Sequence, residues 1–178
     1  MSFLIRQTLI YAVPLMIVAL AGIFAERSGI INLALEGIMI FGAFIGVLFV
    51  RLVQQWGWFD AAMAAKDWPA LQGFMVLAMA VAALFGALFS LLLAFAAINL
   101  KADQTIGGTA LNLLATAIAV VLAKNFSDSG SAKLNYTNRP FLFSIGGLEL
   151  SIFVPLGIIL LIISYVVLYK TRFGLRLR

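Results

Sequence analysis

The chain contains no cysteine and no histidine among its 178 residues. It can therefore form no disulfide, no thiolate or imidazole metal site, and no catalytic dyad that depends on cysteine or histidine. A histidine proton relay is excluded for the same reason. These absences remove most classes of enzyme, and they predict a chain that holds no metal and no cofactor.

Charge is scarce as well. Only 11% of the residues are charged and 64% are hydrophobic, and the mean hydropathy is +1.12. A soluble domain of this length cannot bury so much apolar surface in one core. The basic residues lie mainly near the ends of apolar runs, which suits lipid headgroups better than nucleic acid. We therefore predict an integral membrane protein that contacts lipid and binds no nucleic acid.

Long apolar runs set the fold class. A helix needs about 20 apolar residues to cross about 30 Å of hydrocarbon, and five segments meet this length, at roughly 8–25, 30–50, 72–99, 105–123 and 151–169. None alternates as a strand does, and a lipid-exposed open sheet would leave backbone groups unpaired. The sequence predicts an all-α fold, a polytopic helical membrane bundle, in a single transmembrane domain over residues 1–178.

Two of these segments begin with polar residues. The second starts with Ser28, Gly29 and Asn32 and carries Glu36, and the fourth starts near Gln104 and contains paired glycines. Paired polar and glycine-containing interruptions indicate half-helices that meet near the middle of the membrane. The bundle is therefore expected to include discontinuous or re-entrant helices.

The loops give an orientation. Residues 51–71 hold all three tryptophans and are predicted to lie at the bilayer surface, while residues 124–150 form a polar loop. Residues 170–178 carry four basic side chains, Lys170, Arg172, Arg176 and Arg178, which the positive-inside bias keeps in the cytoplasm. Five crossings then place the N-terminus and both loops outside. Counted together with the tail, the 12 basic residues are divided evenly between the two sides, so the remaining loops do not favour either orientation.

Small residues recur at every fourth position in the second and third segments. Such stripes let the backbones of two helices approach closely. The predicted packing residues are Gly42, Gly46, Ala82, Gly86 and Ser90.

A polar stripe runs along the fourth segment, where Thr105, Thr109, Asn112 and Thr116 fall on one helical face. Lipid would penalise this face, so it either lines a pathway or bonds to a neighbouring helix. Asn32 and Glu36 are four residues apart and are predicted to share a helical face in the same way. The Glu36 carboxylate either pairs with a neighbouring helix or acts in transport, and both readings stay open.

Two segments carry a resemblance to a known family. Glu26–Met39 and Ala102–Thr116 resemble, in the same order, the nucleoside and simple-sugar branch of bacterial ABC-importer permeases, in the broad ribose and branched-chain amino-acid permease family. Lys170–Arg176 is similar to the start of the cytoplasmic loop through which these permeases contact their ATPase. Family members are longer and have further spans after this loop, so the resemblance implies an N-terminal portion.

The resemblance implies a non-catalytic permease subunit in the bacterial cytoplasmic (inner) membrane. Its expected partners are a cytoplasmic ATPase subunit, a second permease subunit that is identical or paralogous, and an extracytoplasmic solute-binding protein. ATP hydrolysis then belongs to a partner, which fits the sequence after Gly107 and Gly108, where Thr109 and Ala110 follow and the lysine of a phosphate-binding loop is missing.

The functional hypothesis is a pathway for nucleosides or simple sugars. Amides and hydroxyls exchange hydrogen bonds with a neutral, ribose-like solute without holding it too tightly. The residues expected to line or brace the pathway are Asn32, Glu36, Gln104, Thr109, Asn112 and Thr116, and those expected to couple to the ATPase are Lys170, Thr171, Arg172, Phe173 and Gly174. The alternatives are a secondary transporter or channel that uses Glu36 for ion coupling, and a structural subunit that needs no polar stripe.

Overall fold

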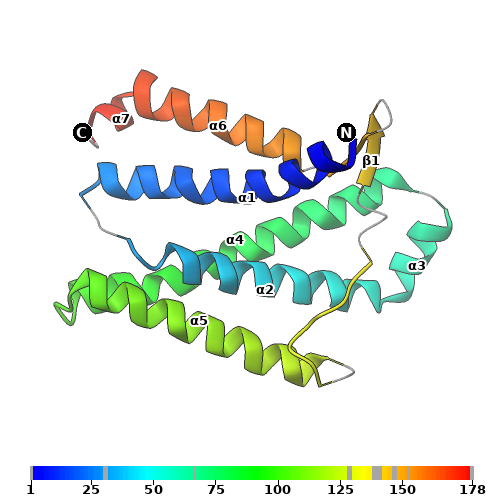
Figure 1. The fold of residues 1–178 in the computed structure, drawn as a ribbon, viewed down its shortest axis with the longest axis horizontal. Helices are drawn as coiled ribbons and strands as arrows, with labels where there is room; N and C mark the ends of the chain where they lie inside the picture. The colour runs from blue at the N-terminus through cyan, green and yellow to red at the C-terminus, as the bar shows by residue number, and fades with distance from the viewer. Residues whose placement is uncertain are drawn as a thin grey trace. The chain divides into compact units, whose positions relative to one another are not determined.

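The computed structural model describes residues 2–29, 32–65, 67–127, 130–137, 142–145, 148–151 and 153–176. In these ranges the elements are α1 (Ser2–Arg27), α2 (Leu35–Gln54), α3 (Gly57–Ala64), α4 (Trp68–Ile98), α5 (Gln104–Phe126), β1 (Leu142–Ile145), β2 (Leu148–Ser151), α6 (Phe153–Lys170) and α7 (Arg172–Arg176), as labelled in Figure 1 where there is room. The predicted helical membrane bundle is confirmed. Among the described residues a short hairpin, in which β1 pairs antiparallel with β2, lies at the end of the predicted polar loop and extends one residue beyond it.

In the part of the chain that the structure describes, five helices are long and apolar enough to cross a membrane. They are α1 from Gln7, α2, α4, α5 and α6, and they match the five apolar segments of the sequence within a few residues at most ends. Large apolar side chains remain exposed along them, for example throughout Ile158–Ile163 of α6. A surface of this kind suits contact with lipid, because hydrocarbon does not penalise apolar groups.

The prediction that Asn32 and Glu36 share a helical face is wrong. The helix α2 begins at Leu35, so Asn32 precedes it, while Glu36 lies in its first turn. The helix α1 ends at Arg27 and is followed by Gly29 at φ +76°, a conformation that interrupts a helix. The start of α2 is fixed by a contact with α5 that is described below.

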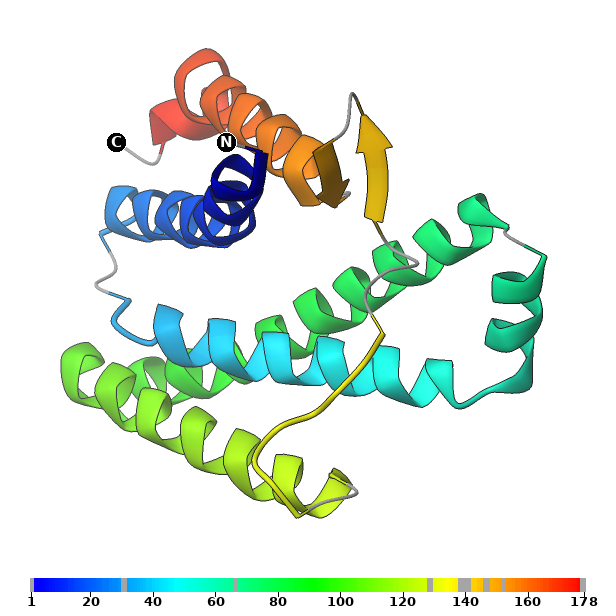
Figure 2. The ribbon, with the colours of Figure 1, turned by 45° about the vertical axis from the view of Figure 1, so that its right-hand side comes forward.

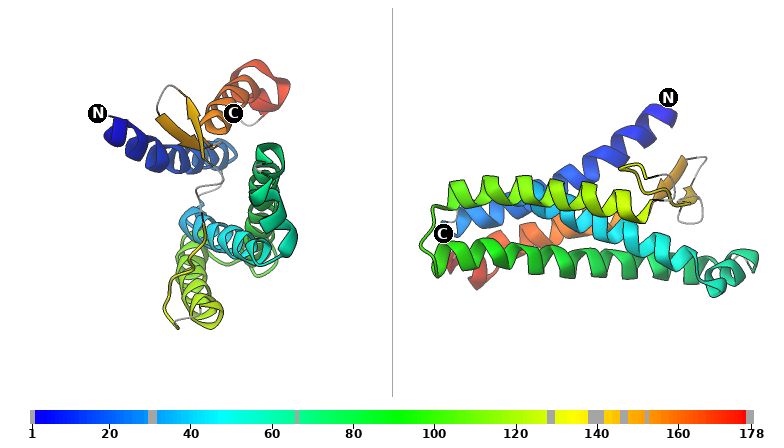
Figure 3. Two further views of the ribbon diagram at one scale, coloured as in Figure 1. Left: turned by 90° about the vertical axis from the view of Figure 1, so that its right-hand side faces the viewer. Right: turned by 90° about the horizontal axis from the view of Figure 1, so that it is seen from below.

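The chain divides into two compact units, which we call the terminal unit (residues 1–32 and 141–178) and the central unit (residues 33–140). In the central unit α2 packs between α4 and α5 (Figure 1, and end-on in the left part of Figure 3). The helix α5 runs in the same direction as α2, and α4 runs in the opposite direction. These directions are those that successive crossings of a membrane require.

The core of the central unit lies where these three helices meet. Its buried residues are Ala34, Phe89, Leu93, Leu111 and Ala115, and Ile38 and Phe41 pack against them. The rings of Phe41 and Phe89 stack with their centroids 4.6 Å apart. Aromatic pairs at such distances add to the free energy gained by burial alone.

Four of the five residues predicted for packing, Gly42, Gly46, Ala82 and Gly86, lie at the α2–α4 contact. A Cβ atom added to Gly42 would come within 3.2 Å of the Ala82 carbonyl oxygen, and one on Gly46 within 3.2 Å of the Ala82 Cβ atom. Gly86 faces Ile38 of α2. The Ser90 hydroxyl donates to the Ala87 carbonyl within its own helix, so it needs no partner on another helix.

In the terminal unit α1 and α6 lie side by side and run in the same direction (Figure 2). They approach closely at Gly157, where an added Cβ atom would meet the Val13 Cγ1 atom at 2.7 Å. The strand β2 contacts α1, and α7 contacts α6. Two parallel helices separated by three other spans are again what five crossings predict.

Candidate functional site

The carboxylate of Asp103 fixes where α5 begins. It accepts hydrogen bonds from the backbone N–H groups of Thr105 at 2.8 Å and Ile106 at 3.1 Å, so it acts as the N-cap. These bonds, that to Ile106 first, hold the pKa of Asp103 below its ordinary value, because they stabilise the ionised form. The cap sets the start of the helix that carries the predicted polar stripe.

Asn112 of α5 inserts its side chain into the hydrogen-bond ladder at the start of α2. The Gly37 N–H donates to the Asn112 Oδ1 atom at 2.7 Å, and the Asn112 Nδ2 group donates to the Leu33 carbonyl at 2.8 Å. Leu33 and Gly37 are four residues apart, so in a continuous helix this carbonyl and N–H would bond to each other. The carboxamide replaces that bond, which explains why α2 begins at Leu35 and not before.

Two glycines permit this approach. A Cβ atom on Gly37 would lie 2.8 Å from the Asn112 Oδ1 atom and 2.9 Å from its Cα atom. A Cβ atom on Gly108 would lie 3.0 Å from the Ala34 nitrogen and 3.0 Å from the Leu33 Cβ atom. We call this contact, formed by Leu33, Ala34, Gly37, Gly108 and Asn112, the α2–α5 joint.

Glu36 lies next to the joint, in the first turn of α2, and its side chain is exposed. The N-terminal end of a helix carries a partial positive charge, which favours a carboxylate there. The side chain of the N-cap residue, Ala34, forms no capping hydrogen bond at this end. Glu36 is therefore a predicted pathway residue whose acidic group stays accessible.

The threonines of the stripe bond within their own helix. The Thr109 hydroxyl donates to the Ile106 carbonyl at 2.9 Å or to that of Thr105 at 3.2 Å, and the Thr116 hydroxyl donates to the Asn112 carbonyl at 2.9 Å. The side chains of Thr109 and Thr116 are exposed. Those of Gln104 and Asn32 are half-buried, and each of these two residues has an interaction partner. The structure thus does not bring the predicted pathway residues into one cluster.

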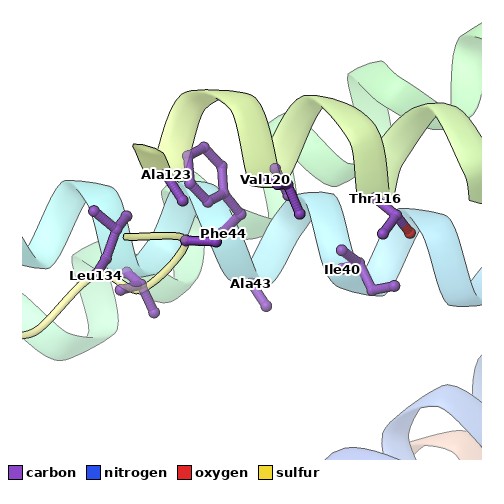
Figure 4. Close-up of a pocket in the computed structure, with 10 residues that line it drawn as sticks. Ile40, Ala43, Phe44, Thr116, Val120, Ala123 and Leu134 are labelled. Atoms are coloured by element: carbon purple, nitrogen blue, oxygen red, sulfur yellow. The ribbon is translucent and has the colours of Figure 1, made fainter. Parts of the chain in front are cut away.

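An apolar groove lies between α2 and α5, and Thr116 contributes the polar hydroxyl among its lining side chains (Figure 4). It encloses about 310 Å³ and is lined by Ile40, Ala43, Phe44, Val47, Thr116, Ala119, Val120, Ala123, Ala132 and Leu134. Because the Thr116 hydroxyl already bonds to its own backbone, the groove suits an apolar chain better than a sugar.

A polar pocket of about 410 Å³ lies at the other end of α2 from the joint. It is lined by Arg51, Gln54, Gln55, Asn135, Tyr136 and Thr137. The Gln54 side chain and the Thr137 backbone exchange two hydrogen bonds, of 2.7 and 3.0 Å, which attach the segment after α5 to α2. The sequence pattern did not pair these residues, because they are 83 positions apart.

The predicted coupling residues lie where α6 meets α7. The Thr171 hydroxyl donates to the Val167 carbonyl at 2.6 Å and accepts from the Gly174 N–H at 3.4 Å. Gly174 is buried, and an added Cβ atom would collide with the Leu168 carbonyl. Lys170, Arg172 and Phe173 are exposed around this turn, which leaves one apolar ring and two cations accessible.

No group of acidic residues suited to a metal ion occurs in the ranges that the structure describes. The residues that sequence reasoning missed are those acting through the main chain, such as Leu33, and those paired over a long sequence separation, such as Arg27 and Tyr169. The glycine next to Glu36 and the glycine pair on α5 were the available signals for the joint.

Comparison with known proteins assigns a family. The family model described as "Branched-chain amino acid transport system / permease component" matches residues 4–178. The whole chain aligns with the nucleoside ABC transporter permease protein NupC of Lactococcus lactis at 38% identity and with the guanosine ABC transporter permease protein NupQ of Bacillus subtilis at 40%, in each case over 55% of the relative.

A third relative is the putative glucose ABC transporter permease protein TsgC13 of Haloferax volcanii, 29% identical over 79% of this chain and 36% of its own length. The chain spans about half the length of the first two relatives. No solved structure matches it. From the family match and the five apolar helices, the chain belongs to the permease-component family of branched-chain amino acid transport systems, as a multi-pass protein of the inner membrane.

Proposed function

We propose that the chain forms part of the transmembrane pathway of an ATP-driven importer for nucleosides or simple sugars, with nucleosides as the main substrates. The alignment of the whole of this chain with two permeases named for nucleoside and guanosine carries this proposal. The relative whose name is that of a putative glucose permease supports sugars as the wider class. The two sequence segments that resemble this branch meet in the α2–α5 joint, which supports a role for the joint in the same function.

The pathway residues take different roles in this proposal. Glu36 is exposed beside the joint, so it is the side chain that faces solute. Asn112 braces the pathway and does not line it, because both ends of its amide bond to the main chain of α2. Thr109 and Thr116 are secondary candidates, since hydroxyls that bond to their own helix are less available to solute. Gln104 and Asn32 are secondary as well, because both are half-buried and already have a partner.

The proposed assembly contains two permease subunits, a cytoplasmic ATPase subunit and an extracytoplasmic solute-binding protein. The permease is non-catalytic, and the ATPase hydrolyses ATP. The residues Lys170, Thr171, Arg172, Phe173 and Gly174 contact the ATPase in this proposal. The exposed Phe173 ring, flanked by cations on a turn fixed by Thr171, supports that contact.

The test is uptake of radiolabelled guanosine into cells or vesicles that contain the full-length permease with its ATPase and binding protein. Unlabelled uridine, ribose and glucose serve as competitors. We expect ATP-dependent guanosine uptake that nucleosides inhibit more strongly than sugars. Uptake that Glu36→Gln reduces, with the same amount of protein in the membrane, supports the role of Glu36, and Glu26→Gln on the exposed end of α1 is the matched control.

Secondary transport through Glu36 is the alternative that this experiment separates. Its accessible carboxylate can exchange a proton or cation, as intramembrane acids in transporters do. Uptake abolished by an uncoupler but unaffected by vanadate or ATP depletion would favour this alternative. Uptake that no substitution on the polar stripe alters would instead indicate a structural subunit.

A further inference from the structure

The helices α1 and α6 are tied together at two levels. Near one end, Gly157 of α6 packs against the Val13 side chain of α1. Near the other end, the last residue of α1, Arg27, bonds to Tyr169 of α6. Val13 and Arg27 are separated by about 21 Å along α1 at about 1.5 Å per residue, so the two contacts hold the helices parallel over most of their length.

The contact between Arg27 and Tyr169 has two components. The Arg27 Nη2 group donates to the Tyr169 hydroxyl at 3.1 Å, and the Arg27 Cζ atom lies 5.4 Å from the centroid of the Tyr169 ring. A guanidinium at this distance is attracted to an aromatic face. Arg27 also ends α1, where a cation interacts favourably with the partial negative charge of the helix C-terminus.

Tyr169 lies two residues before Thr171, where α6 passes into α7. We call Thr171–Gly174, which includes the first residues of α7, the elbow. The Thr171 hydroxyl bonds to both helices, and the buried Gly174 lies against the Leu168 carbonyl, with no room for a side chain. The elbow is thus fixed to α6 through the carbonyl groups of Val167 and Leu168, and Arg27 of α1 bonds to the next residue, Tyr169.

We propose that Arg27 and Tyr169 are positioning residues that make α1 move together with the elbow during transport. The inference rests on the proposed function, in which the elbow contacts the ATPase. Motion delivered to the elbow then reaches α1 through the Arg27–Tyr169 pair, in addition to reaching α6 along the chain. The pair acts through the placement of helices and touches neither solute nor nucleotide.

An ordinary interfacial anchor is the competing explanation, since tyrosine and arginine are common at the membrane surface. Tyr165 separates the two explanations. It lies one turn before Tyr169 on α6, is exposed to a similar degree, and its ring is tilted against that of Tyr169 with centroids 5.2 Å apart. Removing either hydroxyl weakens an anchor equally, but only the Tyr169 hydroxyl bonds to Arg27.

The first measurement follows the distance between α1 and the elbow directly. Spin labels are attached at Ile23→Cys and Leu175→Cys, both exposed, in the full-length protein assembled in lipid. These 178 residues contribute no other cysteine, and any cysteine elsewhere in the protein is replaced by serine first. We expect a narrow distance distribution in the parent and in Tyr165→Phe. Tyr169→Phe and Arg27→Gln should broaden it, and an unchanged distribution in both would overturn the proposal.

The second measurement is the amount of solute transported per ATP hydrolysed by the assembled transporter. Tyr169→Phe should lower this ratio several-fold while the amount of protein in the membrane stays the same, because ATP is still hydrolysed but its motion reaches α1 less completely. Tyr165→Phe should leave the ratio unchanged, and Arg27→Lys should retain part of it. An equal ratio in Tyr169→Phe and the parent would contradict the role in transport.

The two measurements distinguish an error in the proposed function from an error in the positioning role. If the parent shows no ATP-driven uptake of nucleosides or sugars, the proposed function is wrong, and the spin-label distances still decide whether Arg27 and Tyr169 hold α1 to the elbow. If uptake is present but the distances do not change, only the positioning role is lost.

Discussion

The side chain with the clearest structural role is that of Asn112. Its single carboxamide satisfies one main-chain donor and one main-chain acceptor of another helix, at 2.7 and 2.8 Å. Gly37 is buried, so its N–H has little access to water, while the carbonyl of the exposed Leu33 is held by the same side chain. The stability of the joint therefore depends on a group that can donate and accept at once.

Asn112→Ala should destabilise the protein. It removes the partner of the Gly37 N–H, and an unsatisfied group on a buried residue costs about 1–3 kcal/mol. The Leu33 carbonyl loses its partner as well but adds less, because Leu33 is exposed. Thermal unfolding of the purified protein in detergent measures the effect. Asn112→Asp should lose part of the same stability, because an ionised carboxylate accepts from Gly37 but cannot donate to Leu33.

Thr116→Ala is the matched control for this prediction. The Thr116 hydroxyl bonds only to the Asn112 carbonyl of its own helix, so its removal should change stability by less than about 1 kcal/mol. A similar loss in Asn112→Ala and Thr116→Ala would show that the carboxamide bridge contributes little.

Asp103 gives a prediction about pH. Because its pKa is lowered in the folded state by the bonds to Ile106 and Thr105, its contribution is present above its ordinary pKa and is lost as the pH falls through the lowered value. Unfolding temperatures of the parent and of Asp103→Ala should therefore differ at neutral pH and converge in acid. A difference that stays constant from neutral pH to strongly acidic pH would exclude the carboxylate as the cap.

At the scale of elements, the joint is a close crossing that two glycines allow. Gly37→Ala should be destabilising, since the new Cβ atom would come within 3 Å of Asn112 and Leu111 atoms that belong partly to the backbone. Overpacking of this kind typically costs about 1–3 kcal/mol. The measurement is thermal unfolding together with the amount of folded protein recovered from membranes.

Gly73→Ala on α4 provides the control, because no atom lies within 4 Å of its added Cβ atom. Alanine is preferred to glycine inside a helix by about 1 kcal/mol, so this variant should be neutral or more stable. Equal behaviour of Gly37→Ala and Gly73→Ala would mean that the glycine of the joint is not required for close packing.

The elements show what a sequence can and cannot predict. The apolar segments gave the five long helices within a few residues at most ends, because helix length in a membrane is set by its thickness. The start of α2 was misplaced, since the reason it begins at Leu35 is a side chain 75 positions away from Gly37. Periodicity correctly placed Asn112 on the polar face of α5. It predicts which residues share a face, but it does not predict which residue of another helix they contact.

The same limit applies to the candidate site. The threonines of α5 were placed on one face correctly, yet their hydroxyls bond to their own backbone, which a residue pattern does not reveal. The contact between Arg27 and Tyr169 joins residues 142 positions apart. Only the fold brings such residues together, whereas capping by Asp103 follows from local sequence.

At the scale of the whole molecule, the helix directions predict a topology. Within the central unit α4 runs opposite to α2 and α5, and within the terminal unit α1 and α6 run alike. With the basic tail in the cytoplasm, Gln55 and Thr137 lie outside, while Ser28 and Asn99 lie inside.

Single cysteines at these positions test the topology, since the chain has no other cysteine. In intact cells, a membrane-impermeant thiol reagent should label Gln55→Cys and Thr137→Cys. It should label Ser28→Cys and Asn99→Cys only after the membrane is permeabilised. Labelling of all four from outside, or the reverse pattern, would contradict five crossings in this orientation.

The residues of the α2–α5 joint should differ in how well they tolerate mutation. Asn112 bonds to main-chain atoms of Leu33 and Gly37, so its hydrogen bonds do not depend on the side chain of residue 33. Other apolar residues should therefore be accepted at position 33 in a saturation screen. Position 37 has no space for a side chain and should accept little besides glycine. Position 112 is therefore restricted by its hydrogen-bonding chemistry, position 37 by its size, and position 33 by neither.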